Sequence, residues 1–220
     1  DALPILRPRI ISSHLNRASL MAGLLGKVTR IPVISHVHGL NQKIYYQFST
    51  RQIAVSQAVG RHLLDQSLDP AGLEIVRNCI PKAAVGSRKF SRARLRVAIT
   101  AKLHANKGHA WALAAIGRQA GRCGIEKIHL LGDGPERHNL EELCRRPELA
   151  DLVVFHGFVP DPDLFYPDID LILLPSLGEG IPLSLLEAMR FGIPVIATDI
   201  GGIPEIIEHE RSGLLVKPHD

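Results

Sequence analysis

The stretch from residue 169 to residue 205 most strongly constrains what this chain can fold into. It begins with a mainly apolar run, residues 169–174, of the length and composition of a strand buried on both faces. A glycine-containing loop follows, and Pro182 suits the first position of a helix that Gly192 ends. A second apolar run, residues 194–198, completes a strand, loop, helix and strand. Open α/β sheets bind ligands at loops of this kind, which follow the carboxyl ends of parallel strands.

Two carboxylates in this stretch lie eight residues apart. Glu179 is in the loop before the helix, and Glu187 is inside the helix among apolar residues. A buried carboxylate needs a hydrogen-bonding partner. The alternative is that Glu187 belongs to an exposed stripe of an amphipathic helix with Ser184 and Arg190, and that Glu179 is an ordinary loop residue.

Length and composition allow one large or two small domains. The chain has 220 residues, 45% of them hydrophobic, with no apolar run of the ~20 residues that cross a bilayer and no signal peptide pattern. Its three cysteines, Cys79, Cys123 and Cys144, are odd in number and lack C-x-x-C spacing. They indicate neither a disulfide framework nor a zinc site, which favours a cytoplasmic protein.

Charge is distributed unevenly along the chain. Residues 1–95 carry 14 Lys and Arg against 4 Asp and Glu, whereas residues 96–220 carry 12 against 18. A basic first part can face an anionic membrane surface, a phosphorylated acceptor or nucleic acid, or it can simply be a solvated surface. No nucleic-acid-binding motif accompanies the charge, so nucleic acid is not an expected partner.

Apolar runs alternate with helical segments along the rest of the chain, a pattern typical of parallel α/β sheets. The expected strands are residues 9–13, 32–35, 52–56, 73–77, 95–100, 127–131 and 152–159, and the expected helices are residues 15–27, 58–66, 109–122 and 136–145. Residues 82–94 have no steady period. We therefore expect an α/β protein with a partial domain at 1–81, a linker at 82–94 and a second Rossmann-like domain at 95–220.

The stretch around the two carboxylates resembles the E-x7-E motif of retaining glycosyltransferases of family 4. It reads E-G-I-P-L-S-L-L-E-A-M-R-F-G-I-P-V-I-A, where family members typically read E-G-F-G-x-x-x-x-E-A-M-A-x-G-x-P-V-I-A. Ile181 and Pro182 replace Phe and Gly, and Pro182 removes one N–H that could have faced a phosphate.

This resemblance implies a role for each position. Glu179 would bind hydroxyls of the donor sugar without acting as a nucleophile, Glu187 would bind the ribose diol of the nucleotide, and Gly180 would lie in the same donor site. The amides of Leu183 and Ser184 would face the diphosphate, and a helix N-terminus suits an anion on physical grounds as well.

Segments in the first domain show the same resemblance. I-I-S-S-H ends at His14, P-V-I-S-H-V-H-G contains His36 and His38, and I-A-V-S and I-V-R-N-C-I-P follow. The resemblance places His38 near the donor sugar and His14 on the acceptor side. The alternative for His36 and His38 is a strand end with one ring inward and one outward, and two ligands without a third make a poor metal site.

In the second domain, A-K-L-H-A-N-K-G resembles the family pattern G-R-L-x-x-x-K-G. Lys102 stands where Arg is usual, and Lys107 keeps its place. By resemblance both would stabilise the leaving diphosphate, although Lys lacks the bidentate fork of Arg. Either residue alone is equally compatible with a solvated lysine.

Two later loops complete the donor site that the resemblance implies. The sequence G-D-G-P, with Gly132 and Gly134, follows a predicted strand and is by itself a good turn. The segment V-V-F-H-G-F-V matches a family pattern in which the backbone around Phe158 and Val159 would meet the nucleobase.

Two D-x-D triplets, residues 161–163 and 168–170, match the metal-binding motif of GT-A glycosyltransferases. The first is placed to cap a short helix, and the second lies at the start of a strand, away from the ligand edge. We therefore expect donor binding without a metal and no cofactor.

Taken over the chain, the resemblance implies the two-domain GT-B fold. The first strand, its Gly-rich loop and the last helices of the family have no counterpart, which predicts an internal fragment of a longer enzyme. The implied reaction moves a sugar from a UDP- or GDP-sugar to the hydroxyl of a glycan or lipid-linked acceptor with retention, in bacterial surface glycan or lipopolysaccharide synthesis at the inner face of the cytoplasmic membrane. The alternatives are a non-catalytic nucleotide-sugar-binding fragment and a GT-B sugar-nucleotide epimerase.

Overall fold

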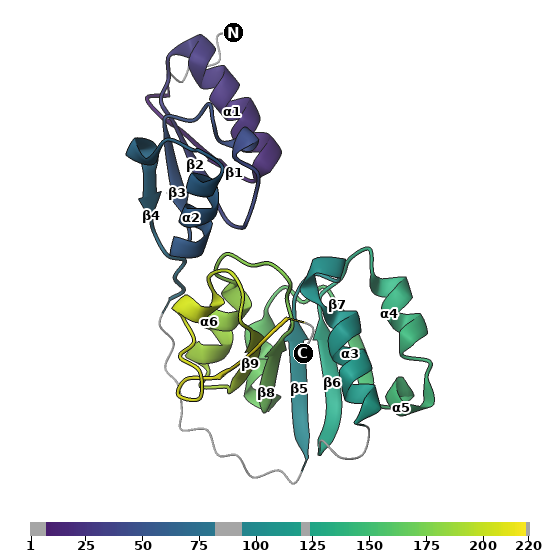
Figure 1. The fold of residues 1–220 in the computed structure, drawn as a ribbon. Helices are drawn as coiled ribbons and strands as arrows, with labels where there is room; N and C mark the ends of the chain where they lie inside the picture. The colour runs from purple at the N-terminus through teal and green to yellow at the C-terminus, as the bar shows by residue number, and fades with distance from the viewer. Residues whose placement is uncertain (1–7, 82–93, 120–123, 219–220) are drawn as a thin grey trace. The chain divides into compact units, whose positions relative to one another are not determined.

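The chain divides into two compact units. The computed structural model describes residues 8–81, 94–119 and 124–218. By contacts, unit 1 comprises residues 1–78 with 179–181, and unit 2 comprises residues 79–178 with 182–220. Each contains a parallel sheet with helices (Figure 1), so the expected α/β class is confirmed. The expected linker at 82–94 lies outside the described residues except for Arg94.

Unit 1 is built on a four-stranded parallel sheet with the order β1-β2-β3-β4. The strands are β1 (Ile11–His14), β2 (Val33–Val37), β3 (Arg51–Ala54) and β4 (Leu73–Ile75). Helices α1 (Asn16–Thr29) and α2 (Gln57–Asp65) are the main connections. The register pairs His14 with His36, so the carboxyl ends of β1 and β2 bring these two residues side by side.

Helix α1 turns its small residues inward. Ser19, Gly23 and Gly26 are buried, while Met21 and Val28 are 71% and 83% exposed. A Cβ on Gly26 would lie only 2.4 Å from Cγ2 of Val33, so the glycine permits the helix to lie close to the sheet. The buried face of α1 is therefore formed by small residues, and several of its large apolar side chains are exposed.

Helix α2 begins at a buried cap. The Oγ atom of Ser56 accepts a hydrogen bond from the backbone N–H of Val59 at 3.0 Å. This contact satisfies one of the amides that the first helical turn leaves without a partner.

We expect Ser56→Ala to destabilise α2 by about 1 kcal/mol, because the Val59 amide loses its acceptor. Hydrogen exchange of the Val59 amide should then be about fivefold faster, as follows from that free energy. The conservative variant Ser56→Thr keeps an Oγ acceptor and should retain most of the protection. Equal exchange rates in the two variants would contradict the capping role.

Unit 2 is built on a six-stranded parallel sheet with the order β10-β9-β8-β5-β6-β7. The strands are β5 (Leu95–Thr100), β6 (Ile125–Leu131), β7 (Val153–Gly157), β8 (Leu171–Leu174), β9 (Val195–Thr198) and β10 (Leu214–Val216). This is the Rossmann order, in which the order of the parallel strands reverses between β5 and β8. Ligands of such sheets bind outside the carboxyl ends of the strands at that point.

Helices cover both faces of the second sheet (Figure 1). The helices α3 (His109–Arg118), α4 (Arg137–Leu143) and α5 (Pro147–Ala150) contribute to one core cluster, and α6 (Leu183–Arg190) contributes to the other. Pro182 is the N-cap of α6, with a ψ of 130°, so its predicted place at the first helical position is wrong by one residue. Gly192 follows the helix at a φ of 64°, as a helix-ending glycine does.

Candidate functional site

The loops after β5 and β8 meet at the reversal point of unit 2. The N–H of Leu177 donates to the carbonyl of Asn106 at 2.7 Å. Gly108 has a φ of 70°, and a Cβ there would lie 1.9 Å from the carbonyl oxygen of Pro175. Only glycine allows this approach. The contact fixes the backbone next to Lys107, one of the two lysines that the sequence predicts to hold a diphosphate.

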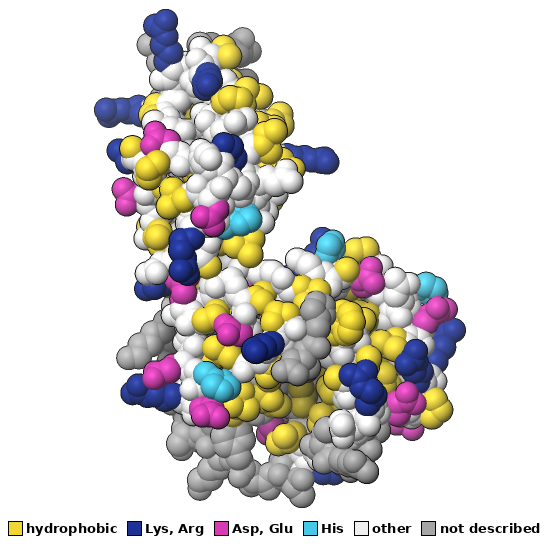
Figure 2. All heavy atoms as spheres, viewed as in Figure 1, with side chains coloured by type: hydrophobic (Ala, Val, Ile, Leu, Met, Phe, Trp, Pro, Cys, Tyr) yellow, Lys and Arg dark blue, Asp and Glu magenta, His cyan; other side chains and the backbone are white. Residues whose placement is uncertain are grey.

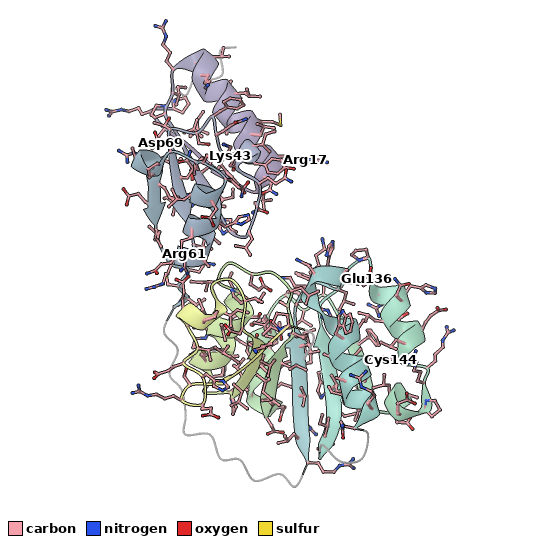
Figure 3. The ribbon with its side chains drawn as sticks, viewed as in Figure 1. Arg17, Lys43, Arg61, Asp69, Glu136 and Cys144 are labelled. Carbon is pink, nitrogen blue, oxygen red and sulfur yellow. The ribbon has the colours of Figure 1, made fainter. Side chains whose placement is uncertain are left out.

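The glycines of G-D-G-P hold a second pair of loops together. A Cβ on Gly132, at a φ of 150°, would lie 2.0 Å from the carbonyl oxygen of Ala101, and one on Gly134 would lie 2.3 Å from that of Leu103. Two hydrogen bonds complete the contact. The N–H of Leu103 donates to the Asp133 carbonyl at 3.0 Å, and the N–H of Glu136, just before α4 (Figure 3), donates to the Leu103 carbonyl at 3.0 Å.

A pocket of about 400 Å³ opens at the carboxyl ends of β5, β6 and β7. Its lining includes four residues of the predicted donor site, Lys102, Gly132, Phe158 and Val159, together with Asp133, which the sequence did not single out. Phe158 is 76% exposed, so its ring is available to a planar ligand. Lys102 is exposed at the rim. This pocket joins predicted site residues that are up to 57 positions apart in the chain.

The first turn of α3 contains a buried histidine next to Lys107. His109 is 2% exposed, and neither ring nitrogen has a hydrogen-bond partner among the described residues. Burial, and secondarily the Lys107 cation, lowers the pKa of His109 to about 4. The sequence predicted His109 only as the start of a helix. Its position directly after Lys107 and Gly108 was the one local sign that it lies beside a predicted site residue.

Helix α6 places the second carboxylate of the E-x7-E motif against a tyrosine. The Tyr166 hydroxyl donates to Oε2 of Glu187 at 2.9 Å, which supplies the partner that the sequence required. Arg190 is 15% exposed and contacts both carboxylate oxygens of Asp163. The alternative that assigned Arg190 to an exposed stripe is therefore wrong. Tyr166 was missed because an isolated tyrosine before an apolar strand looks like a core residue.

No side chain of the described residues caps the N-terminus of α6. Its N-cap is Pro182, and the first helical residues are Leu183 and Ser184. The N–H of Leu185 donates to the carbonyl of Pro182 at 3.2 Å, which begins the hydrogen bonding of this turn. The amides of Leu183 and Ser184 therefore lie at the positive end of the helix dipole, where anions bind.

Three histidines gather at the carboxyl edge of the unit 1 sheet. Nδ1 of His14 and Nε2 of His38 are 3.0 Å apart, and the ring of His14 stacks on that of His36 with centroids 4.2 Å apart. His36 and His38 thus lie on the same side, and the alternative of one ring inward and one outward is wrong. Burial, and secondarily His14, lowers the pKa of both His36 and His38. Within the described ranges no group of three or more metal-binding side chains could hold a metal ion.

Glu179 and Gly180 belong by contacts to unit 1, with the Glu179 side chain buried. The predicted site residues thus form two groups. One group is in unit 1: His14, His38, Glu179 and Gly180. The other is in unit 2: Lys102, Lys107, Gly132, Gly134, Phe158, Val159, Leu183, Ser184 and Glu187.

The two D-x-D triplets have structural contacts. Asp161 caps a short helix by accepting the N–H of Asp163 at 3.2 Å, and Oδ2 of Asp170 accepts the N–H of Arg96 at 2.9 Å.

Among the described cysteines, Cys79 and Cys144 are free thiols. In the part of the chain that the structure describes, no helix is both long and apolar enough to span a bilayer.

A family model and the similar curated proteins both identify glycosyltransferases as relatives of this chain. Residues 94–220 match the family model described as glycosyl transferases group 1. The chain is 38% identical over 135 residues to the putative colanic acid biosynthesis glycosyltransferase WcaL of Escherichia coli K12, and 36% identical over 136 residues to the amylovoran biosynthesis glycosyltransferase AmsK of Erwinia amylovora. Each match covers 57% of this chain and 33% of the relative, so the chain spans about a third of their length.

Solved structures share the fold over nearly the whole chain. The Anabaena protein Alr3699/HepE in complex with UDP-glucose superposes with a TM-score of 0.80 and 22% identity, covering 96% of this chain and 65% of that one. The lipopolysaccharide outer core galactosyltransferase WaaB gives 0.75 and 20%, covering 97% and 63%. The expected two-domain GT-B class is therefore confirmed at the level of fold.

Proposed function

The chain belongs to the glycosyl transferases group 1 family, and we propose that it binds the nucleotide of a UDP-sugar in unit 2 for sugar transfer to an acceptor hydroxyl with retention. The observation that carries the proposal is the pocket at the carboxyl ends of β5, β6 and β7, which lies on the ligand edge of a Rossmann sheet. UDP rather than GDP is favoured because a structural neighbour binds UDP-glucose.

Each proposed contact follows from the chemistry of the residue. The nucleobase would lie in the pocket by Phe158 and Val159, and Glu187 would accept hydrogen bonds from the ribose diol. The diphosphate would face the amides of Leu183 and Ser184.

The proposed chemistry is electrostatic stabilisation of a leaving group. Negative charge grows on the diphosphate as the sugar departs, and Lys102 and Lys107 would oppose it with fixed positive charge, as would the α6 dipole. Glu179 and Gly180 would contact the donor sugar with His38, and His14 would lie on the acceptor side. No metal or cofactor enters this proposal.

The acceptor is proposed to be a bacterial surface glycan or a lipid-linked precursor, because the matched relatives are named for colanic acid and amylovoran synthesis. The site of action would then be the inner face of the cytoplasmic membrane. Figure 2 shows Lys and Arg side chains spread over unit 1 on the face in view, which is compatible with weak attraction to anionic lipid.

Calorimetric titration with UDP and GDP tests the proposal. UDP should bind more tightly than GDP, and Lys107→Ala and Glu187→Ala should each weaken UDP by about tenfold to a hundredfold, as expected for a lost charge-assisted hydrogen bond. Lys127→Ala is the matched control, because Lys127 lies at the opposite end of β6 and contacts the Asp151 carbonyl. No binding of either nucleotide by the folded chain, or equal losses in Lys107→Ala and Lys127→Ala, would contradict the proposal.

A further inference from the structure

Two polar contacts join α6 to the segment between β7 and β8. Tyr166 bonds Glu187, and Asp163 bonds Arg190. Within each segment the two contact residues are three positions apart, so the contacts form successive rungs between the same two elements. Only the first rung includes the carboxylate of the E-x7-E motif.

Tyr166 places a polar hydroxyl group in an apolar core. It is 0% exposed, belongs to the core cluster of α6, β8 and β9, and lies with its ring 5.3 Å from that of Phe191. A phenylalanine would fill the same space without bringing a hydroxyl into the core. A buried hydroxyl costs free energy unless it is hydrogen-bonded, and here it donates to a carboxylate on the helix beside it.

The phenol remains a donor under all ordinary assay conditions. Burial, and secondarily the Glu187 carboxylate, raises the pKa of Tyr166 above its usual value. The hydrogen therefore stays on the phenol oxygen, and Oε2 of Glu187 accepts it at 2.9 Å. A charged acceptor makes this bond stronger than one between two neutral groups.

We propose that Tyr166 is a positioning residue, which holds the Glu187 carboxylate in the orientation that receives the ribose diol of the donor nucleotide. A free glutamate side chain has several rotamers, and ligand binding must otherwise select one of them. The bond to Oε2 makes that selection before the ligand arrives. It leaves Oε1 and a second lone pair of Oε2 to accept the two ribose hydroxyls.

This inference rests on the proposed function, because it takes Glu187 to be the ribose ligand. It gives a role in nucleotide binding to Tyr166, a residue to which the family resemblance assigned no role. It also predicts that Tyr166 and Glu187 act through one contact, so their effects on nucleotide affinity are coupled rather than additive.

The test is calorimetric titration of the full chain with UDP and with 2′-deoxy-UDP. Tyr166→Phe should weaken UDP by about tenfold, the amount expected for one hydrogen bond to a charged group, and should weaken 2′-deoxy-UDP less. A general disturbance of the fold would weaken both nucleotides by the same factor. Asp163→Asn is the matched control, since it removes the charge of the Asp163 side chain that pairs with Arg190 between the same elements and should leave the ratio of the two affinities unchanged.

Two further variants separate this inference from the proposed function. Glu187→Ala should reduce the preference for UDP over 2′-deoxy-UDP, and Tyr166→Phe should have little additional effect in the Glu187→Ala background. If Glu187→Ala loses that preference while Tyr166→Phe binds as the unmodified chain does, the positioning role is wrong and the ribose role of Glu187 stands. If Glu187→Ala keeps the full preference for UDP, the ribose role itself is wrong.

Discussion

Gly108→Ala should destabilise unit 2 by at least about 3 kcal/mol, among the larger effects of a single substitution. The added Cβ would lie 1.9 Å from the carbonyl oxygen of Pro175, and the backbone conformation, with a φ of 70°, already disfavours any side chain. A backbone carbonyl cannot rotate away as a flexible side chain can, so the two loops must separate. Urea denaturation followed by the fluorescence of Trp111, the single tryptophan of the chain and a residue of α3, measures this loss.

Two other glycines separate the clash from the backbone strain. Gly124 has a φ of 61°, and no atom of the described residues lies within 4 Å of an added Cβ, so Gly124→Ala should cost only about 1 kcal/mol. Gly178, in the loop after β8, has no positive φ. Within the part of the chain that the structure describes, no atom lies within 4 Å of the position that an added Cβ would take, so Gly178→Ala should be close to neutral. A loss in Gly108→Ala no greater than that in Gly124→Ala would show that the loops are not tightly joined.

Unit 2 should lose about 3 kcal/mol of stability to His109 alone as the pH falls from 7 to 4. The folded pKa of His109 is about 4, below the 6.5 of an unfolded histidine. Above pH 6.5 both states are neutral, and the group has no effect. Between pH 6.5 and 4 the unfolded state takes up a proton that the folded state excludes, at about 1.4 kcal/mol per pH unit.

The control is His109→Leu, which replaces the ring by an apolar side chain and removes the titration. Its stability at pH 8 should match or exceed that of the unmodified chain, because two unpartnered ring nitrogens leave the core. The stability difference between the two proteins, measured by Trp111 fluorescence in urea, should grow steadily from pH 6.5 to pH 4. A difference independent of pH would contradict a buried, neutral His109.

Local sequence patterns predicted every strand of the two sheets except β10, within a few residues of its observed bounds. The strand at residues 95–100 has the predicted bounds, and the loop glycines Gly132 and Gly134 lie where the motif placed them. These features depend on residues close together in the chain, where turn chemistry and apolar runs are readable.

Features that depend on long-range packing were not predictable in this way. The Tyr166 and Glu187 contact joins residues 21 positions apart, and the fit of Gly108 against Pro175 joins residues still more distant. No feature of the sequence next to these residues identifies their contact partners. The buried glycines of α1 are not predictable from hydrophobic periodicity either, since that pattern assumes that large apolar residues face the sheet.

The strand order of unit 2 has a consequence for how the protein acquires its structure. Strand β5 pairs with β6, which follows it directly, and with β8, where the bonded residues Arg96 and Asp170 are 74 positions apart. Closing the longer loop costs more chain entropy, and contacts of high sequence separation slow folding. We therefore expect β5, β6 and β7 to assemble first during synthesis, with one side of β5 unpaired until β8 emerges from the ribosome. The edge of the sheet that we propose to bind the nucleotide needs loops from both sides, so it would be the last part of the unit to mature.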